Sequence, residues 1–247
     1  MNANPGGGTR WLRTLRDVWF PPVCVHCRRL VEVPTRRHLC ERCAAYLHRI
    51  EGPHCRTCGY PYFGAGAEDR VCEHCETLVP VFGEGRAAVL LRGPARTLVI
   101  DLKYHAGLHV LEEIGLIAAE TAGYLDYLRG AVLVPVPLHP RKERERGYNQ
   151  SSLLAETFAR VAGGGTSVAE PIKRVADTST QTRLDRSARQ KNLRNAFAPR
   201  TDKEVDRTRR YVLVDDVFTT GATLNACADV LRRMGGAMID VATFGHG

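Results

Sequence analysis

Residues 211–223 have the sequence YVLVDDVFTTGAT, in which an apolar run leads into two acids and then into a small, hydroxyl-rich turn. The apolar run is typical of a buried strand and the turn of a helix start. Backbone N–H groups at a helix start bind phosphate, and Gly221 permits a tight bend. Asp215 and Asp216 are suited to hold two sugar hydroxyls, or Mg2+ through water. The stretch therefore predicts a site for a phosphorylated ribose. The alternative, a Thr-rich helix cap with two solvated acids, is disfavoured because adjacent acids precede the turn.

Around this stretch, strand-length apolar runs alternate with longer helical patterns. Strands are expected at 87–91, 131–136, 171–176, 211–217 and 238–244, and helices at 94–104, 108–128, 150–162 and 222–234. This alternation predicts a mainly parallel α/β sheet with flanking helices, which binds ligands beyond the carboxyl ends of its strands. Two long polar segments, 137–149 and 177–210, connect these elements, and the second is too long and too basic for a simple connection.

The cysteines predict a zinc-binding segment ahead of the sheet. Eight of the nine form four Cys-x-x-Cys pairs, which are Cys24/Cys27, Cys40/Cys43, Cys55/Cys58 and Cys72/Cys75. This regular spacing indicates two structural zinc sites, since four thiolates fill each tetrahedron and leave no position for water. We favour sequential pairing, in which the first two pairs share one ion and the last two share the other. Cross-braced pairing stays open.

Two other ligand assignments are less favoured. A neighbouring histidine, from the set His26, His38, His54 and His74, is a possible substitute for one cysteine of a site. Disulfides are disfavoured because the chain shows no export signal. A zinc ribbon of this size folds only with metal. It could contact nucleic acid, contact another protein, or brace its neighbouring domain, and the sequence leaves these roles open.

The composition suggests three parts. We expect an N-terminal amphipathic helix at 1–20, a double zinc-ribbon domain at 21–80 and the α/β domain at 81–247. The helix is expected to dock on its own protein, and peripheral contact with a membrane surface is the alternative. No apolar run reaches transmembrane length, so we expect a cytoplasmic protein. Neither a P-loop nor a GxGxxG fingerprint is present, which argues against a P-loop ATPase and a usual dinucleotide enzyme.

Positive charge is concentrated in residues 171–210. The formal net charge is +8, and two four-thiolate zinc sites would reduce it to about +4. Residues 171–210 carry 12 Lys and Arg against 5 acids. A lid that closes over a phosphorylated substrate and a surface that binds nucleic-acid phosphates would both use such charges, and a solvated helix face is the alternative.

Several motifs resemble one family. Residues 211–223 resemble the 5-phosphoribosyl-1-pyrophosphate (PRPP) loop of type I phosphoribosyltransferases, and residues 134–150, VPVPLHPRKERERGYNQ, are similar to the pyrophosphate loop of ComF/GntX-type proteins. Residues 102–104 match as well. A spaced set also matches, namely Thr178, Gln181, Leu184, Arg189, Asn192, Ala196 and Phe197. With the paired cysteines in front, the chain is identified as a member of the ComF family.

The resemblance implies a type I phosphoribosyltransferase-like domain behind the zinc ribbons, with PRPP and Mg2+ as ligands. Asp215 and Asp216 would be the catalytic acids that hold the ribose diol. The 5′-phosphate would lie on Thr219, Thr220, Gly221, Ala222 and Thr223. Pyrophosphate would be bound by Lys103, Pro137, Leu138, His139, Arg141 and Arg146. A flexible loop with Arg183, Arg186, Arg189 and Lys191 would close over the site.

Three functions are compatible with this resemblance. The first is a PRPP-dependent glycosyltransferase with an unknown acceptor. The second is a factor that handles single-stranded DNA in natural transformation, with a competence helicase as a partner. The third is an adaptor that senses PRPP without turnover. Few residues follow the last expected strand, so an acceptor site is expected from residues 81–130, from the zinc ribbons, or not at all.

Overall fold

The computed structural model describes residues 21–32, 35–64, 68–104, 107–176 and 195–247. The predicted N-terminal helix at 1–20 lies outside these ranges. So do the predicted loop residues Arg183, Arg186, Arg189 and Lys191, and most of the spaced matching set, Thr178, Gln181, Leu184 and Asn192.

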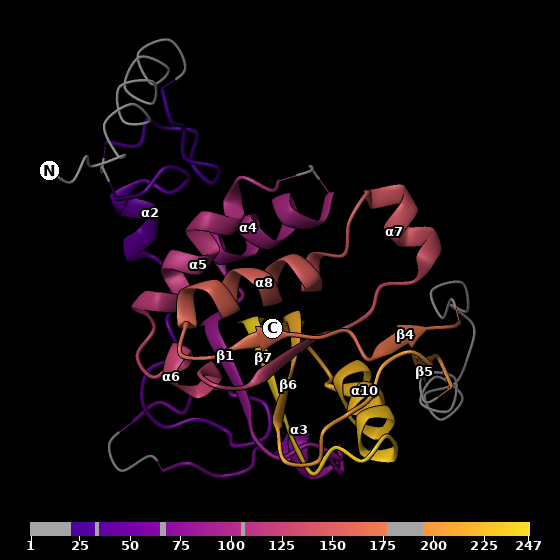
Figure 1. Ribbon diagram of the computed structural model, residues 1–247. Coiled ribbons are helices and arrows are strands. Elements are labelled where there is room, and N and C mark those ends of the chain that lie inside the picture. Colours follow the sequence, from indigo (N-terminus) through magenta and orange to yellow (C-terminus); the bar gives the residue numbers. More distant parts are fainter. Residues whose placement is uncertain (1–20, 33–34, 65–67, 105–106, 177–194) are drawn as a thin grey trace, which may run out of the picture.

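A five-stranded sheet forms the centre of the protein (Figure 1). Its order is β1-β7-β6-β2-β3, and every pairing is parallel. The strands are β1 (Gly85–Leu90), β2 (Val132–Pro135), β3 (Ser167–Val168), β6 (Arg210–Phe218) and β7 (Met238–His246). The two long central strands are mostly buried, as a sheet covered on both faces requires. The predicted fold class is thus confirmed.

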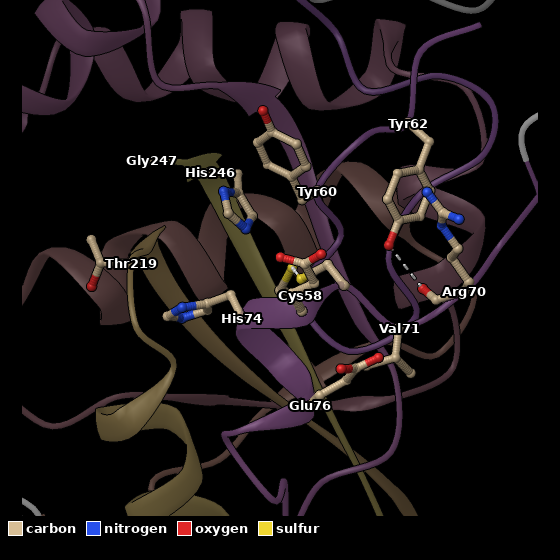
Figure 2. Close-up of a pocket in the computed structure, with 12 residues that line it drawn as sticks. Cys58, Tyr60, Tyr62, Arg70, Val71, His74, Glu76, Thr219, His246 and Gly247 are labelled. Carbon is tan, nitrogen blue, oxygen red and sulfur yellow. Dashed lines mark hydrogen bonds between the residues drawn. The ribbon is translucent and has the colours of Figure 1, made fainter.

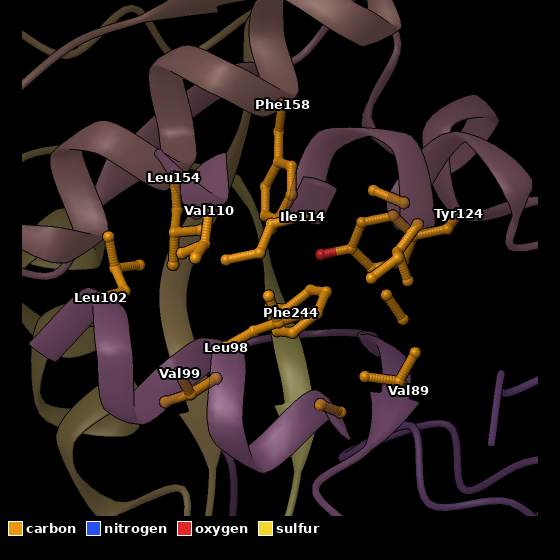
Figure 3. Close-up of a cluster of buried hydrophobic side chains, with 14 of the residues drawn as sticks. Val89, Leu98, Val99, Leu102, Val110, Ile114, Tyr124, Leu154, Phe158 and Phe244 are labelled. Carbon is orange, nitrogen blue, oxygen red and sulfur yellow. The ribbon is translucent and has the colours of Figure 1, made fainter. Parts of the chain in front are cut away.

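Helices cover both faces of the sheet. The first face carries α4 (Gly93–Tyr104), α5 (Val110–Glu120), α6 (Tyr124–Leu128) and α8 (Gln150–Ala162), whereas α10 (Ala222–Arg233) covers the second (Figure 1). Figure 3 shows the first core, in which Leu98, Ile114, Phe158 and Phe244 interlock. Among the described residues, no helix combines the length and the apolar character that a membrane span requires.

Two predicted elements are corrected by the structure. The single helix expected at 108–128 is divided into α5 and α6, because Thr121 is extended and Gly123 adopts a left-handed φ of 72°. The strand expected at 171–176 is present as β4 (Ile172–Arg174), but it pairs antiparallel with β5 (Phe197–Pro199) outside the main sheet. Pro171, directly before β4, has no N–H to donate to a parallel ladder, and β3 takes the sheet-edge position instead.

The segment 137–149 is also more ordered than its polarity suggested. It contains the helix α7 (Pro140–Arg146), with the His139 side chain as its N-terminal cap, Pro140 in its first turn and a left-handed Gly147 at its end. None of the α7 residues is buried. Because the helix buries no apolar face, it has no hydrophobic periodicity from which it could be predicted.

The two zinc ribbons pack on opposite faces of the sheet (Figure 1). The first, with the short helix α2 (Glu41–Ala45), contributes Cys24, Leu39 and Leu47 to the core under α4 and α5. The second, with α3 (Glu73–Glu76), joins the core under α10. The boundary predicted near residue 80 therefore separates two segments that share their hydrophobic cores.

The linker between the ribbons covers the edge strand β1. Leu90 donates its N–H to the His48 carbonyl at 2.8 Å, and Ile50 donates to the Ala88 carbonyl at 3.0 Å. The second ribbon then approaches β1 closely, since a Cβ on Gly85 would lie 2.1 Å from the Thr57 carbonyl oxygen. An uncovered edge strand would be free to pair with other chains, so the ribbon linker closes this side of the sheet.

Candidate functional site

The eight paired cysteines form two separate clusters. Cys24, Cys27, Cys40 and Cys43 compose the first, and Cys55, Cys58, Cys72 and Cys75 compose the second, with all ligand atoms of a cluster within 4.8 Å of one another. The Cys27 and Cys40 sulfurs are 3.6 Å apart, and the Cys58 and Cys72 sulfurs 3.9 Å. A zinc tetrahedron with bonds of about 2.3 Å has edges of about 3.8 Å. Both clusters fit zinc, and the sequential pairing is confirmed.

The other ligand assignments do not fit this geometry. His26 Nδ1 lies 2.8 Å from Thr97 Oγ1, and His54 Nδ1 lies 2.8 Å from the Gly52 carbonyl. His38 packs against the His109 ring at 4.8 Å. All nine cysteines are free of disulfides. A zinc ion in either cluster would have four sulfur ligands and no open position, as is typical of structural sites.

At the carboxyl end of β6, Asp215 and Asp216 have different partners. Asp215 Oδ1 accepts hydrogen bonds from Ser151 Oγ, at 2.9 Å, and from the Asp216 N–H, at 2.9 Å. Burial, together with the charge of Asp216, raises the pKa of Asp215 to about 7. The Asp215 carboxyl therefore changes charge near neutral pH.

Asp216 pairs with a cation from a distant helix. Lys103 Nζ, in the last turn of α4, lies 2.9 Å from Asp216 Oδ1. The carboxyl is only 4% exposed, and its Oδ2 atom has no hydrogen-bond partner among the described residues. A buried acceptor without a partner is costly, and a sugar hydroxyl or a water ligand of Mg2+ would satisfy it. The carboxyl group thus fits both predicted ligands.

The turn after these acids ends in a glycine that begins helix α10. Gly221 adopts a left-handed φ of 70° and precedes the first residue of α10, a helix of 12 residues. A side chain is excluded there, because a Cβ on Gly221 would lie 2.6 Å from the Phe218 ring and 2.9 Å from Leu78. The side chains of Thr219 and Thr220 are exposed, while Ala222 and Thr223 are half-buried at the helix start. All five predicted loop residues therefore surround one helix N-terminus.

The predicted pyrophosphate residues fall into two groups. Lys103 and Arg146 line one cavity of about 440 Å3, together with Tyr104 and Lys142. The Arg146 guanidinium lies 5.5 Å from the centre of the Tyr104 ring. This basic cavity adjoins the acids through the Lys103–Asp216 ion pair.

The remaining predicted pyrophosphate residues lie apart from that cavity. Pro137 and Leu138 line a second cavity of about 230 Å3, which also contains Lys173 and Arg174. His139 caps α7, and the exposed Arg141 pairs with Glu145 at 2.9 Å. Of the predicted pyrophosphate residues, the structure thus brings Lys103 to Asp216 and places Arg146 in the same cavity as Lys103.

Sequence reasoning missed the residues that hold this site in place. Ser151 fixes Asp215, Asn149 caps α8 and donates to the Val136 carbonyl, and the Tyr148 hydroxyl donates to the Leu102 carbonyl beside Lys103. Tyr148 and Asn149 belong to the GYNQ end of the segment that resembles the pyrophosphate loop, and Ser151 follows that segment directly. That motif is the feature of the sequence from which these supporting residues could have been predicted.

A larger cleft lies between the second zinc ribbon and the ends of β6 and β7 (Figure 2). Its volume is about 770 Å3, and its lining includes Tyr60, Tyr62, Arg70, Thr219 and His246. The His246 ring packs edge-on against Tyr60 and stacks on the Phe218 ring. Burial lowers the pKa of His246 to about 4, so its imidazole is neutral at pH 7. The sequence did not predict this cleft, because a single histidine and scattered tyrosines form no motif with a recognisable spacing.

Comparisons with known proteins agree with this arrangement. A family model described as a double zinc ribbon domain matches residues 15–76. Competence protein F of Haemophilus influenzae is 30% identical over 224 residues, which cover 88% of this chain and 94% of that protein. DNA utilization protein YhgH of Salmonella typhi is 30% identical over 90% of this chain and 95% of its own length. Competence protein ComFC of Bacillus subtilis is 27% identical over 96% of this chain and 95% of its own.

Solved structures with similarity to the chain include two phosphoribosyltransferases. A hypoxanthine phosphoribosyltransferase from Staphylococcus aureus has 13% identity and a TM-score of 0.33 over 55% of this chain and 62% of its own. A purine phosphoribosyltransferase from Pyrococcus horikoshii has 15% identity and a TM-score of 0.32 over 54% of this chain and 71% of its own.

The fold and its sites define a protein in which a double zinc ribbon is joined to a five-stranded parallel sheet with flanking helices. Full-length similarity to the competence proteins identifies the relatives more closely. The chain belongs to the ComF family.

Replacing Cys55 and Cys58 with serine is expected to reduce the zinc content from two ions per chain to one, because serine does not replace a thiolate ligand. Metal analysis of the purified protein measures this content. Cys227→Ser is the matched control, since Cys227 is a buried residue of α10 outside both clusters. Two zinc ions retained in the double variant would contradict the assignment of the second site.

Asp215→Asn is expected to stabilise the protein at pH 7.5 by about 1–2 kcal/mol, allowing for the half-buried position of the side chain. The folded pKa is raised from the ordinary 3.8 to about 7. Between these values only the folded state keeps the proton, so the wild type loses stability as pH rises, and the asparagine variant does not. Urea unfolding across this range measures the difference, which should vanish near pH 4. The control substitution is Asp126→Asn, because Asp126 is exposed. A similar pH dependence of stability in that control would refute the raised pKa of Asp215 as the cause.

Proposed function

We propose that this protein binds PRPP with Mg2+ at the β6–α10 loop and transfers the phosphoribosyl group to an acceptor. The observation that carries the proposal is the buried Asp216 carboxyl, which has one unpartnered oxygen and lies beside a glycine-led helix start. Anion-binding N–H groups, two adjacent acids and a neighbouring basic cavity match a sugar that carries a phosphate and a pyrophosphate.

Each part of the site has one task in this reaction. The loop from Thr219 to Thr223 holds the 5′-phosphate, while Asp215 and Asp216 accept hydrogen bonds from the two ribose hydroxyls. Lys103 and Arg146 neutralise the pyrophosphate as it leaves with the electrons of its bond to the ribose carbon. The acceptor forms its bond to the same carbon and loses a proton. Fixed cations at the leaving group and fixed acids on the ring stabilise the separated charges.

The two acids also suit Mg2+ bound with the substrate. Carboxylate oxygens bind this ion directly or through its waters, and bound Mg2+ supplies further neutralisation of the pyrophosphate. The Lys103–Asp216 pair at 2.9 Å holds the carboxyl in place before any ligand arrives.

Asp215→Asn combined with Asp216→Asn is expected to weaken PRPP binding at least a hundredfold, since both hydroxyl acceptors lose their charge. Isothermal calorimetry of PRPP with Mg2+ against the zinc-loaded protein measures the affinity. The matched control combines Asp126→Asn with Asp229→Asn, both on exposed helix faces. Unchanged affinity in the Asp215/Asp216 variant would refute the proposed site, whereas binding without turnover over many acceptors would favour a PRPP-sensing adaptor.

Handling of single-stranded DNA is the second candidate function. Its support is the names of the relatives, a competence protein and a DNA utilization protein, together with the excess of basic residues at 171–210. In this function the zinc ribbons and the basic residues at 171–210 would contact phosphates.

Binding of a fluorescent oligothymidylate is expected to weaken with salt, with a slope of roughly −0.7 in log K against log [salt] for each phosphate contacted. Fluorescence anisotropy at several salt concentrations measures the slope. The triple variant with Arg200, Lys203 and Arg207 changed to glutamine should reduce the slope, because it removes three cations of this region. The control Arg129→Gln removes a cation that pairs with Asp126 elsewhere. Salt-independent binding, or none, would count against this function.

A further inference from the structure

Helix α4 presents four exposed side chains along one face, which together form the α4 ridge. Arg92 directly precedes the helix, and Arg96, Ile100 and Tyr104 follow it at intervals of four residues. Residues four apart lie on one face of a helix, and all four side chains are exposed, Tyr104 to 70%. At a rise of about 1.5 Å per residue, the ridge is about 18 Å long. Because these side chains add nothing to the core, packing does not explain their identity.

The first half of the α4 ridge is positively charged and adjoins the first zinc ribbon. His26 Nδ1, in the first Cys-x-x-Cys turn of that ribbon, lies 2.8 Å from Thr97 Oγ1 on α4. The residues directly after that turn are two further exposed arginines, Arg28 and Arg29. Neither these two nor Arg92 and Arg96 have an ion-pair partner among the described residues. Four cations without counter-charges therefore gather at this end of α4.

The other end of the α4 ridge combines an aromatic ring with further cations. Tyr104 lines the basic cavity of about 440 Å3 together with Lys142 and Arg146. The Arg146 guanidinium lies 5.5 Å from the centre of the Tyr104 ring, and Lys142 has no ion-pair partner within the described ranges. The acid of this cavity, Glu145, pairs with Arg141 at 2.9 Å. Pyrophosphate would use the cations of the cavity, but it gains nothing from the exposed ring.

The α4 ridge therefore joins two basic surfaces. Figure 1 shows α4 between the first zinc ribbon and α7, the helix that supplies Lys142 and Arg146. A ligand that matches the whole ridge carries several negative charges in a row and at least one planar ring, as a nucleic acid strand does. A length of about 18 Å corresponds to about five phosphates at the spacing of about 3.4 Å along one strand.

A single strand fits the α4 ridge better than a duplex or a lipid surface. Stacking on an aromatic side chain requires the free face of a base, which a duplex keeps within its own stack. A helix that lies on a membrane requires a broad apolar face, whereas the ridge offers only Ile100 and Tyr104 beside its arginines. The exposed ring thus favours unpaired bases, and the cations favour their phosphates.

We propose that the α4 ridge binds single-stranded nucleic acid, with phosphates on Arg92, Arg96 and the two arginines of the first zinc ribbon and a base stacked on Tyr104. The proposal rests on the second candidate function, the handling of single-stranded DNA, and is independent of the transfer reaction. It gives that function a helix surface outside residues 171–210. Strands of DNA and RNA share these phosphates and base faces, and the 2′-hydroxyl of RNA distinguishes them.

Arg92→Gln combined with Arg96→Gln is expected to weaken binding of a fluorescent oligothymidylate at least tenfold and to reduce the salt slope by about 1.4, or about 0.7 for each of two phosphate contacts. Fluorescence anisotropy of the zinc-loaded full chain at several salt concentrations measures both. The matched control combines Arg129→Gln with Arg160→Gln, which removes two exposed arginines at the ends of α6 and α8. The control should change neither the affinity nor the slope.

Tyr104→Ala tests the stacked base separately from the phosphates. It is expected to weaken the same binding at least fivefold without changing the salt slope, because it removes a stacking surface and no cation. Tyr104→Phe keeps the ring and should restore most of the affinity. The control Phe63→Ala removes an equally exposed ring from the second zinc ribbon and should leave binding unchanged. Tighter binding of an oligouridylate that depends on the same residues would support the ridge as a surface for RNA.

Three outcomes would overturn the proposal, and each leaves the other functions distinguishable. Strand binding that none of the α4 variants weakens would refute the ridge and leave DNA handling to residues 171–210. Absence of strand binding would refute DNA handling as well, while calorimetry of PRPP with Mg2+ on the same samples tests the transfer site separately. Binding of the wild type to vesicles of phosphatidylcholine and phosphatidylserine, lost in the Arg92/Arg96 variant and without any strand binding, would assign the ridge to a membrane surface.

Discussion

The burial of two adjacent carboxyl groups at the end of the central strand is the constraint on which the site depends. An ionised carboxyl is costly to bury without partners, and Asp215 and Asp216 obtain theirs from different helices. Ser151 at the start of α8 donates to the first, and Lys103 at the end of α4 pairs with the second. Both helices are held on the sheet by the same apolar core, in which Leu102 and Leu154 are fully buried. The packing of one face of the sheet therefore sets the positions of the groups around the acids.

The zinc ribbons give the sheet a support that its own helices do not provide. Each ribbon is too small to bury an adequate core by itself, so zinc coordination supplies the free energy that folds it. Once folded, one ribbon packs on each face of the sheet and the linker between them pairs with β1. The close approach of Thr57 to Gly85 leaves no space for a side chain. The second ribbon is therefore fixed against the sheet, and it forms a wall of the cleft at His246.

Two cavities of different character flank the phosphate loop. The cavity at Lys103 and Arg146 is basic and borders Asp216, whereas the cleft at His246 is lined by aromatic rings and by more acids than cations. An anionic group is therefore favoured in the basic cavity and disfavoured in the cleft.

The sequence by itself determined the parallel α/β fold, the two four-cysteine zinc sites and the loop at residues 215–223. These features are encoded locally, by apolar periodicity, by ligand spacing and by adjacent residues of one strand-to-helix turn. Helix α7 escaped prediction because it buries no apolar face, and β4 left the main sheet although its composition fits a strand. Only the tertiary structure decided that Lys103 pairs with Asp216, that Ser151 fixes Asp215, and that Tyr60 meets His246. These partners are far apart along the chain, and a single lysine, serine or histidine carries no periodicity, so only the packing of the ribbons and helices on the sheet brings them together.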